Sequence, residues 1–223
     1  VAASAGEQRV VFDRLSLEQG LSQSIIEQIA QDRKGFMWFA TEDGLNRFDG
    51  YRFTVFKNLP GNANSLSYNE LKAVFEDRDG VIWVGTFESG LNSFDPSTET
   101  VVRYRHDDGD PGSLSADTVR CILEDRSGRL WVGTQGGGLD RLDRATGTFH
   151  HYREERAGGS GAGRDDVRAI VEDRSGVLWV GSNGGGLGRL DPESGELTRF
   201  THDPADPHSL SDDRVLAILE DHT

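Results

Sequence analysis

Three basic residues occupy one recurring position in this chain. They are Lys72, Arg120 and Arg168, spaced 48 residues apart, and each lies five residues before an aspartate that begins a Gly–Trp phrase. Ammonium and guanidinium groups that converge on one place bind carboxylates through charge-assisted hydrogen bonds. In a chain whose net charge is −14, such a cluster predicts a site for an acidic sugar or another carboxylate. The alternative is that these residues form salt bridges with neighbouring Asp or Glu.

Two loops carry histidine beside aspartate. His106–Asp107 lies in the loop Arg105–Ser113, and His202–Asp203 lies in the loop Thr201–Ser209. Imidazole and carboxylate groups can bind divalent ions, but the full spacing of an EF-hand loop and its terminal Glu are missing. Turn chemistry explains the same residues without a metal. No Ser/His/Asp or Cys/His constellation stands out, so we predict no catalytic residues, no metal site and no cofactor.

The elements that position these residues follow from a phrase that recurs four times, Asp-x-x-Gly-x-x-Trp. The tryptophans lie at Trp38, Trp83, Trp131 and Trp179, in steps of 45, 48 and 48 residues. A repeat of this length, built from short strands, is the signature of a β-propeller blade. We therefore predict an all-β propeller with four complete four-stranded blades and lone terminal strands, a fragment of a larger propeller.

Each phrase predicts a tight turn followed by a buried strand. The aspartate side chain can accept hydrogen bonds from the backbone that follows, and the glycine supplies the positive φ of a hairpin. A tryptophan in every unit is interpreted as a wedge between blades rather than as a ligand platform. We assign structural roles to Trp38, Trp83, Trp131, Trp179, Asp32, Asp77, Asp125, Asp173, Gly35, Gly80, Gly128 and Gly176.

Four strands are expected in each unit, with the strand before the Asp innermost and the strand before the next loop outermost. The predicted blades cover residues 24–57, 69–105, 117–153 and 165–201. Propeller ligands bind where variable loops surround the central funnel. The turn after each tryptophan strand differs between blades, so we add Phe87, Gln135 and Asn183 to the three basic residues as candidate ligand contacts.

The two ends of the chain extend this pattern. Residues 9–15 resemble a lone outer strand, and residues 213–221 read as the start of a fifth blade whose Gly and Trp do not follow. A closed four-bladed ring is one alternative. The expected arrangement is an open arc, or copies that associate through its unpaired apolar edges, since exposed strands such as VLAIL invite pairing.

Composition limits the classes of binding partner and the cellular compartment that suit this chain. A net charge of −14 over 223 residues argues against nucleic acid or anionic lipid as a partner. The one cysteine, Cys121, lies within an apolar pattern and is expected to be a small buried hydrophobe. No apolar run is long enough for a transmembrane helix. The opening VAASAGEQ fits a chain from which a secretory signal peptide has been removed.

The repeated submotifs resemble one known family over Leu21–Asp221. They are the GLS run-in, the ED that ends the first strand, D-R-x-G-x-x-W-x-G-T, GL-N/D-R-F/L-D and an aromatic strand end. Together they resemble the two-component regulator propeller repeat. In that family such repeats form periplasmic sensor propellers of membrane proteins, often as seven-bladed rings, whose outputs are histidine kinases, hybrid kinases or diguanylate cyclases.

The resemblance implies a periplasmic binding module with no catalysis in this chain. Its expected partners are an unknown small-molecule or saccharide ligand and further copies of the chain. Contact with a membrane would come only through other parts of the parent protein. The alternative is an enzyme similar to propeller lyases and lactonases, which place histidine and a metal in the funnel. No histidine falls on the predicted inner strands, which disfavours that alternative.

Overall fold

The computed structural model describes residues 14–152 and 165–221, and it confirms the all-β fold with four four-stranded antiparallel sheets. A short 3-10 helix, η1 (Leu17–Gln19), precedes the sheets. The first sheet contains β1 (Ile26–Gln31), β2 (Met37–Thr41), β3 (Gly44–Phe48) and β4 (Phe53–Phe56), and the second contains β5 (Leu71–Glu76), β6 (Ile82–Thr86), β7 (Leu91–Asp95) and β8 (Thr100–Tyr104). The third contains β9 (Val119–Glu124), β10 (Leu130–Thr134), β11 (Gly138–Asp143) and β12 (Thr148–Tyr152), and the fourth contains β13 (Val167–Glu172), β14 (Leu178–Ser182), β15 (Gly186–Leu190) and β16 (Leu197–Phe200).

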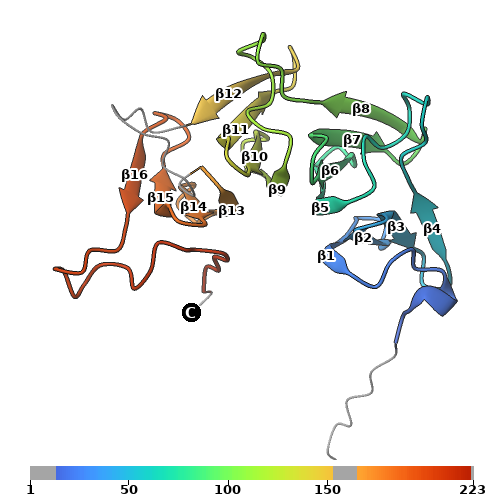
Figure 1. The fold of residues 1–223 in the computed structure, drawn as a ribbon, viewed down its shortest axis with the longest axis horizontal. Coiled ribbons are helices and arrows are strands. Elements are labelled where there is room, and N and C mark those ends of the chain that lie inside the picture. The colour runs from blue at the N-terminus through green and yellow to red at the C-terminus, as the bar shows by residue number, and fades with distance from the viewer. Residues whose placement is uncertain (1–13, 153–164, 222–223) are drawn as a thin grey trace, which may run out of the picture.

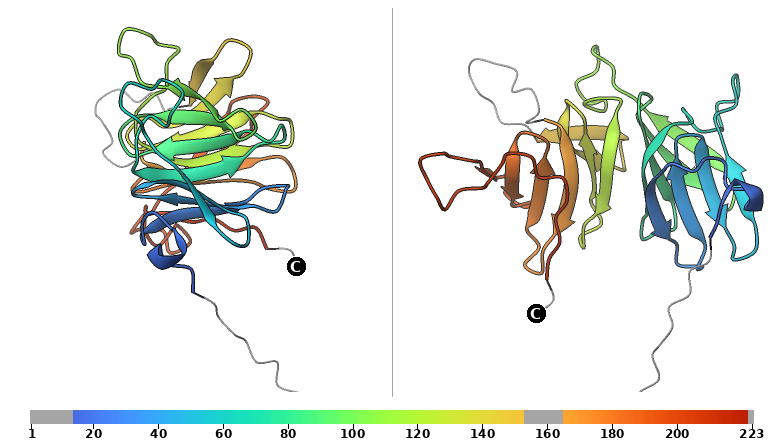
Figure 2. Two further views of the ribbon diagram at one scale, coloured as in Figure 1. Left: turned by 90° about the vertical axis from the view of Figure 1, so that its right-hand side faces the viewer. Right: turned by 60° about the horizontal axis from the view of Figure 1, so that its bottom comes forward.

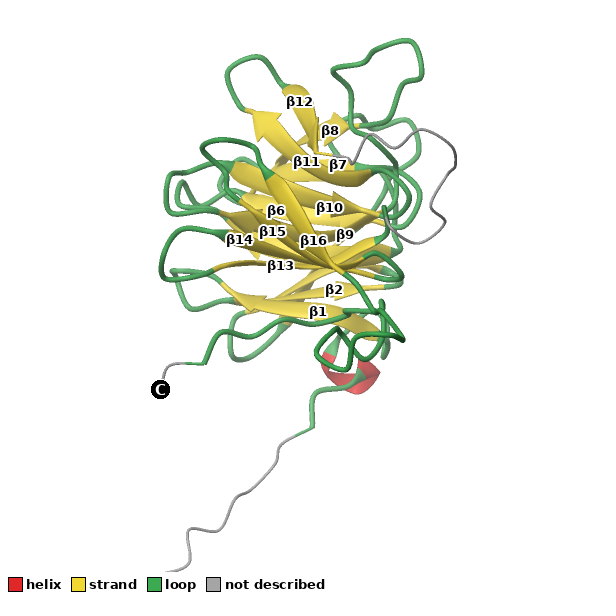
Figure 3. Ribbon diagram, turned by 90° about the vertical axis from the view of Figure 1, so that its left-hand side faces the viewer, coloured by secondary structure: helices red, strands yellow, loops and turns green. Residues whose placement is uncertain are grey.

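The four sheets are the blades of an arc that is open between the first and the fourth (Figure 1). Strands β1, β5, β9 and β13 lie next to one another along the inner side, and β4, β8, β12 and β16 lie outside. Neighbouring blades approach closely, and a side chain at Gly133 of β10 would place its Cβ 2.6 Å from the side chain of Val167 on β13. Figures 2 and 3 show the sheets stacked face to face, with turns gathered at the two ends of the strands.

Each blade begins with the same hydrogen-bonded hairpin. In the first blade, Oδ1 of Asp32 accepts hydrogen bonds from the backbone N–H groups of Lys34 and Phe36, both at 2.9 Å. The turn between them contains Gly35, whose φ of 89° lies in the region that glycine favours. Oδ2 of Asp32 accepts the indole N–H of Trp38 at 2.8 Å. The other three blades repeat this Asp–Trp bond at 2.7, 2.9 and 2.8 Å.

The core is divided among the contacts between neighbouring blades. Trp38 is fully buried and belongs to one apolar cluster with Leu71, Val74 and Phe94 of the second blade. Its ring meets that of Phe94 edge-on, at 6.0 Å between centroids. The second cluster joins Trp83 to the third blade, and the third joins Trp131 to the fourth. Each blade therefore depends on its neighbour to cover one face, as stacked repeats do.

The two edges of the arc differ from the interior. On the inner strand of the first blade, Ile29 is 51% exposed, and in the fourth blade Trp179 is only partly buried. Where we expected a strand at 213–221, the structure has one bridge, between Arg214 and Asn183, and no strand. With no second strand of that blade beside it, this segment has no ladder of hydrogen bonds to complete.

The expected outer strand at 9–15 lies mostly outside the described residues. Its last two residues, Arg14 and Leu15, are described and are not in a strand. They are followed by η1, which is capped by the Ser16 side chain through a bond from the backbone of Glu18. Within the described ranges, no helix has the length and apolar character needed to cross a membrane.

Candidate functional site

The six candidate ligand contacts lie at one end of the inner strands. Lys72, Arg120 and Arg168 are the second residues of β5, β9 and β13, while the three turn residues Phe87, Gln135 and Asn183 directly follow β6, β10 and β14. In each blade the hairpin register pairs the start of the inner strand with the end of the next strand. The structure therefore brings the six residues together on an inner rim, defined here by their positions.

Each basic residue of the inner rim falls at a β-bulge. In the second blade Leu71 pairs with Thr86 and Ala73 pairs with Gly85, so Lys72 has no partner in the ladder. The registers leave Arg120 and Arg168 in the same situation in the third and fourth blades. A bulge bends the strand and redirects the side chain of its extra residue, and bulges are enriched beside functional sites. The basic side chains are thus placed by a repeated backbone feature.

Arg120 has an unusual environment for a partly buried cation. Its Nε donates to Oε1 of Gln135 at 3.0 Å, one Nη donates to the same oxygen, and its guanidinium lies over the Phe87 ring at 5.8 Å. Among the described residues no carboxylate forms an ion pair with it. Burial, followed by the charge of nearby Arg168, lowers the pKa of Arg120 from its ordinary value. The charges of Asp166, Glu27 and Glu70 act on Arg120 from a distance, but its guanidinium faces the rim without an ion pair to a described residue.

Lys72 forms salt bridges with neighbouring glutamates, as the alternative interpretation of the basic residues predicts. Its ammonium lies 2.6 Å from Glu27 and 2.9 Å from Glu70, and its side chain is 9% exposed. Burial favours a lower pKa for Lys72, but the hydrogen bonds that its ammonium donates to Glu27 and Glu70 outweigh burial and raise the pKa. Lys72 also lies over the ring of Phe87, at 5.4 Å from its centroid. We infer that it orders the rim more than it attracts an anion.

Arg168 is also paired, but incompletely. One Nη donates to Oδ2 of Asp166 at 2.8 Å, and the Asn183 amide donates to that same oxygen at 3.0 Å. Within the described part of the chain, the buried Nε of Arg168 and the buried Oδ1 of Asp166 have no hydrogen-bond partner. Buried polar atoms without partners are rare and call for an explanation. A polar ligand that reached this end of β13 would satisfy them.

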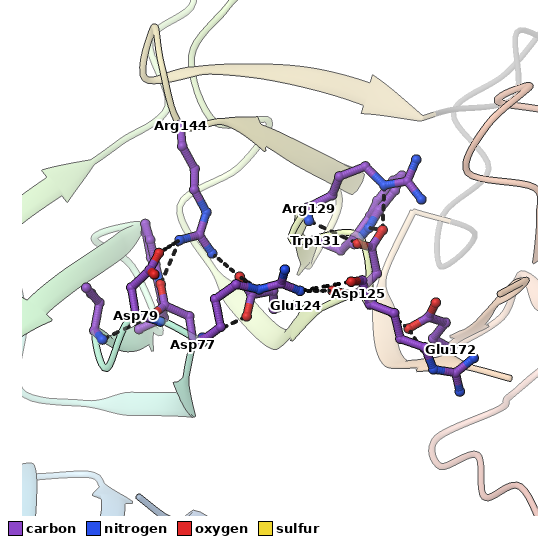
Figure 4. A network of polar contacts seen from close by, with 12 residues as sticks. Asp77, Asp79, Glu124, Asp125, Arg129, Trp131, Arg144 and Glu172 are labelled. Atoms are coloured by element: carbon purple, nitrogen blue, oxygen red, sulfur yellow. Dashed lines mark hydrogen bonds and ion pairs between the residues drawn. The ribbon is translucent and has the colours of Figure 1, made fainter. Parts of the chain in front are cut away.

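A second group of charges, which sequence reasoning missed, lies at the opposite ends of the strands (Figure 4). Arg144, in the turn after β11, bridges Asp77 of the second blade and Glu124 of its own blade, with both contacts at 2.8 Å. In the next interface Arg129 bonds Asp125 at 2.6 Å and Glu193 of the fourth blade at 2.8 Å. These arginines join neighbouring blades and flank the buried tryptophans.

The histidine-containing loops are organised by turn chemistry. Nδ1 of His106 lies 2.7 Å from the carbonyl oxygen of Leu114, and Nδ1 of His202 lies 2.6 Å from that of Leu210. The backbone hydrogen bond to Leu114 and the Asp108 carboxylate raise the pKa of His106. In the ranges that the structure describes, no group of three or more His, Cys, Asp or Glu residues is placed to hold a metal ion.

Four segments of the chain match one protein family, described as the two component regulator propeller. The matches cover residues 20–43, 65–88, 113–136 and 162–184, one for each blade. A curated relative, histidine kinase P4 from Formosa agariphila, is 39% identical over 67 residues. That match covers 30% of this chain and 5% of the relative, so it concerns a small part of the larger protein.

Solved structures with this fold include the extracellular domains of hybrid two component systems from B. thetaiotaomicron. The BT3049 domain is 26% identical with a TM-score of 0.65, over 94% of this chain and 39% of that one. The BT4673 domain is 24% identical with a TM-score of 0.64, over 85% and 27%. The virginiamycin B lyase from Staphylococcus aureus shares the fold alone, at 16% identity and a TM-score of 0.60, over 81% and 56%.

Proposed function

The chain is built from two component regulator propeller repeats, and from this premise we propose that it is the ligand-sensing propeller of a two-component-type signal transduction protein. We place it on the periplasmic side of the membrane and assign it no catalysis of its own. The likeness to extracellular domains of hybrid two component systems supports this proposal. The kinase or other output would belong to parts of the parent protein outside this chain.

The ligand that suits the inner rim is a small molecule or saccharide that carries a carboxylate. The observation that carries this assignment is Arg120, a guanidinium held against Phe87 and Gln135 with no carboxylate partner among the described residues. A planar guanidinium can bind a carboxylate through two parallel hydrogen bonds. The Phe87 ring offers an apolar face to a sugar, and Gln135 and Asn183 offer amides for its hydroxyl groups.

Such a ligand would act across blade boundaries. Arg120 and Arg168 lie at equivalent positions on adjacent inner strands, and the positive charge of Arg168 contributes to lowering the pKa of Arg120. An anion between them removes this like-charge repulsion and favours the arrangement in which the third and fourth blades approach most closely. The resulting bias on signalling equals the difference in the ligand's affinity for the two arrangements and can be no larger.

The proposal is tested with trigalacturonic acid as the acidic probe and galactotriose as the neutral one, by isothermal titration calorimetry. We expect saturable binding of the acidic probe alone, and a loss of at least tenfold in affinity in Arg120→Gln. The matched control is Arg52→Gln, which changes the same charge at an exposed position in the turn before β4. Equal affinities for Arg120→Gln and Arg52→Gln would refute the assignment of the rim.

A further inference from the structure

A polar hollow of about 240 Å³ lies between the first and second blades, at the strand ends opposite the inner rim. Its lining includes the carboxylates of Asp32 and Glu76 and the aromatic side chains of Phe36 and Trp38. We propose that this hollow is a binding site for a guanidinium group, the side-chain group of arginine, supplied from outside the described chain. The proposal is independent of the sensing function and uses a different surface.

The next blade interface shows how a guanidinium is held in this setting. Arg144 donates from one Nη to Oδ2 of Asp77 and from the other to Oε1 of Glu124, both at 2.8 Å, and lies over the Trp83 ring at 5.7 Å (Figure 4). The two carboxylates come from neighbouring blades and receive the two arms of one planar fork. A fork of this kind matches guanidinium and does not match a lysine ammonium, which is a point charge.

The repeat places the same receiving groups in the first interface. Asp32, Glu76 and Trp38 are equivalent to Asp77, Glu124 and Trp83, at offsets of 45, 48 and 45 residues. Both carboxylates are in place: Asp32 is 8% exposed and the Glu76 side chain is 13% exposed. The residue equivalent to Arg144 is Pro96, which has no group to donate. The first interface thus has the acceptors of this motif without its donor.

The third interface shows that the chain replaces the donor when the arginine is absent. Pro192 occupies the Arg144 position there. Arg129, the residue directly before β10, bonds Oδ2 of Asp125 at 2.6 Å instead. Its guanidinium also bonds Glu193 at 2.8 Å. The equivalent of Arg129 in the first blade is Phe36. In two of the three interfaces the chain thus supplies a guanidinium bonded to the turn aspartate. In the first interface Asp32 has no such donor among the described residues, and Glu76 has only the Arg33 guanidinium, at 3.9 Å.

Arg47 also lines the hollow, but it occupies a different place. Its guanidinium lies over the rings of Phe36 and Trp38 at 5.1 and 5.7 Å, and it forms no hydrogen bond or ion pair with any described residue. Its equivalent in the third blade, Arg141, lies over Trp131 while Arg129 bonds Asp125 in the same interface. A stacked arginine and a carboxylate-bound arginine thus coexist in that interface.

The acceptors of the first interface retain bonding capacity. In the described chain, Oδ2 of Asp32 accepts only the Trp38 indole, whereas Oδ2 of Asp77 accepts both Trp83 and Arg144. Oε2 of Glu76 accepts the backbone N–H of Arg33 and lies 3.9 Å from the Arg33 Nε, while Oε1 has no hydrogen bond from a described residue. Asp79 and Asp95 also line the hollow, so four acidic residues there face two basic ones, Lys34 and Arg47. The balance favours a cation that can reach both inner carboxylates.

The test follows the Trp38 indole N–H resonance in ¹⁵N-labelled protein during titration with millimolar methylguanidinium chloride, with methylammonium chloride at equal ionic strength as the control. We expect a saturable shift with methylguanidinium and at most a weak linear drift with methylammonium. Pro96→Arg supplies the donor from within the chain and should weaken methylguanidinium binding at least tenfold. The matched variant Pro192→Arg changes the third interface, where Arg129 already binds, and should leave the Trp38 titration unchanged.

Two further measurements complete the test. Glu76→Gln keeps the size of the side chain and should weaken methylguanidinium binding about fivefold. This variant keeps the test decisive if Pro96→Arg does not fold. A peptide Gly-Arg-Gly with blocked ends, compared with Gly-Lys-Gly, distinguishes the sources: tighter binding than methylguanidinium supports an arginine of a protein partner, and equal binding supports a small guanidino compound. The absence of a saturable Trp38 shift, or equal binding by wild type, Pro96→Arg and Glu76→Gln, would overturn the proposal.

Discussion

Replacing Arg144 by methionine tests whether the guanidinium that bridges two blades stabilises the arc. The methionine keeps much of the apolar length of the side chain and removes the charge. It eliminates two hydrogen bonds of 2.8 Å, to Asp77 and Glu124, and the contact with the Trp83 ring. The two carboxylates that lose this contact are 0% and 6% exposed, so water replaces the arginine poorly.

The magnitude follows from these contacts. Hydrogen bonds to charged groups contribute about 1.5–3 kcal/mol each, which gives roughly 3–6 kcal/mol for the pair. Three observations reduce this value: the Arg144 side chain is 30% exposed, Glu124 keeps Arg78, and Asp77 keeps the Trp83 indole. We expect Arg144→Met to lower the free energy of unfolding by about 2–3 kcal/mol, near the lower end for loss of one partner from a buried pair.

The assay is urea unfolding followed by tryptophan fluorescence. The matched variant is Arg126→Met, because Arg126 is 57% exposed and lies 3.9 Å from Glu172, so its ion pair should contribute less than about 1 kcal/mol. A loss of less than about 1 kcal/mol for Arg144→Met, or equal losses for the two variants, would show that the bridge contributes little. The premise that the first interface lacks a useful donor would then fail with it.

Three further predictions concern acid, thiol chemistry and the open edges. Partial burial favours a higher pKa for Asp173, but hydrogen bonds from Ser175 and the Trp179 indole outweigh it and lower the pKa to about 2. Because the pKa of Asp173 in the folded protein lies below its unfolded value, the ionised carboxylate stabilises the fold fully above about pH 4, and this stabilisation is lost as the pH falls toward 2. In urea unfolding, the loss of stability caused by Asp173→Asn should therefore shrink over that range. Burial raises the pKa of the Cys121 thiol to about 12, so native protein at pH 8 should react with iodoacetamide at least a hundredfold more slowly than unfolded protein; comparable rates would contradict this raised pKa. Light scattering should show a mass that rises with concentration, and Ile29→Lys on the exposed edge of the arc should give a monomer, whereas a wild-type monomer at every concentration would refute association through the edges.

Much of the fold is predictable from the sequence because every blade repeats the same local chemistry. The turn aspartate, the glycine and the tryptophan recur in one frame, and the structure forms a four-stranded sheet around each of the four copies. The bond between the aspartate and the indole N–H six residues later is not visible in the sequence pattern. Hydrogen bonds from the backbone amides of the turn are enough to explain why an aspartate stands there. Nothing in the spacing therefore predicts that its second carboxylate oxygen accepts the indole N–H of the tryptophan.

The sequence predicts that the three basic residues lie together, but it predicts less of what they contact. Counting back from each aspartate located Lys72, Arg120 and Arg168, but the bulges that redirect them were not foreseen. In a half-exposed strand, a bulge interrupts the alternation of apolar and polar residues and can be seen in the sequence. These inner strands pack against blades on both faces, so their residues do not alternate in this way. The partners of Lys72 come from the first blade and from the residue Glu70 before its own strand, so its neutralisation depends on how the blades stack.

A strict repeat makes departures from it informative about bonding. Where a position carries the same residue in every blade, as the tryptophan does, the common scaffold explains it. Where one blade lacks a donor that its neighbour uses, as at Pro96 and Arg144, the unchanged acceptors Asp32 and Glu76 show what is missing and of which chemical kind. Among the described residues Asp32 has no ion-pair partner, and Glu76 has only Arg33 at 3.9 Å. Because burying a carboxylate without a close compensating charge costs free energy, a further cation would stabilise these acceptors. The comparison between blades therefore favours guanidinium for this hollow, from contacts that the same chain makes 45 to 48 residues further on.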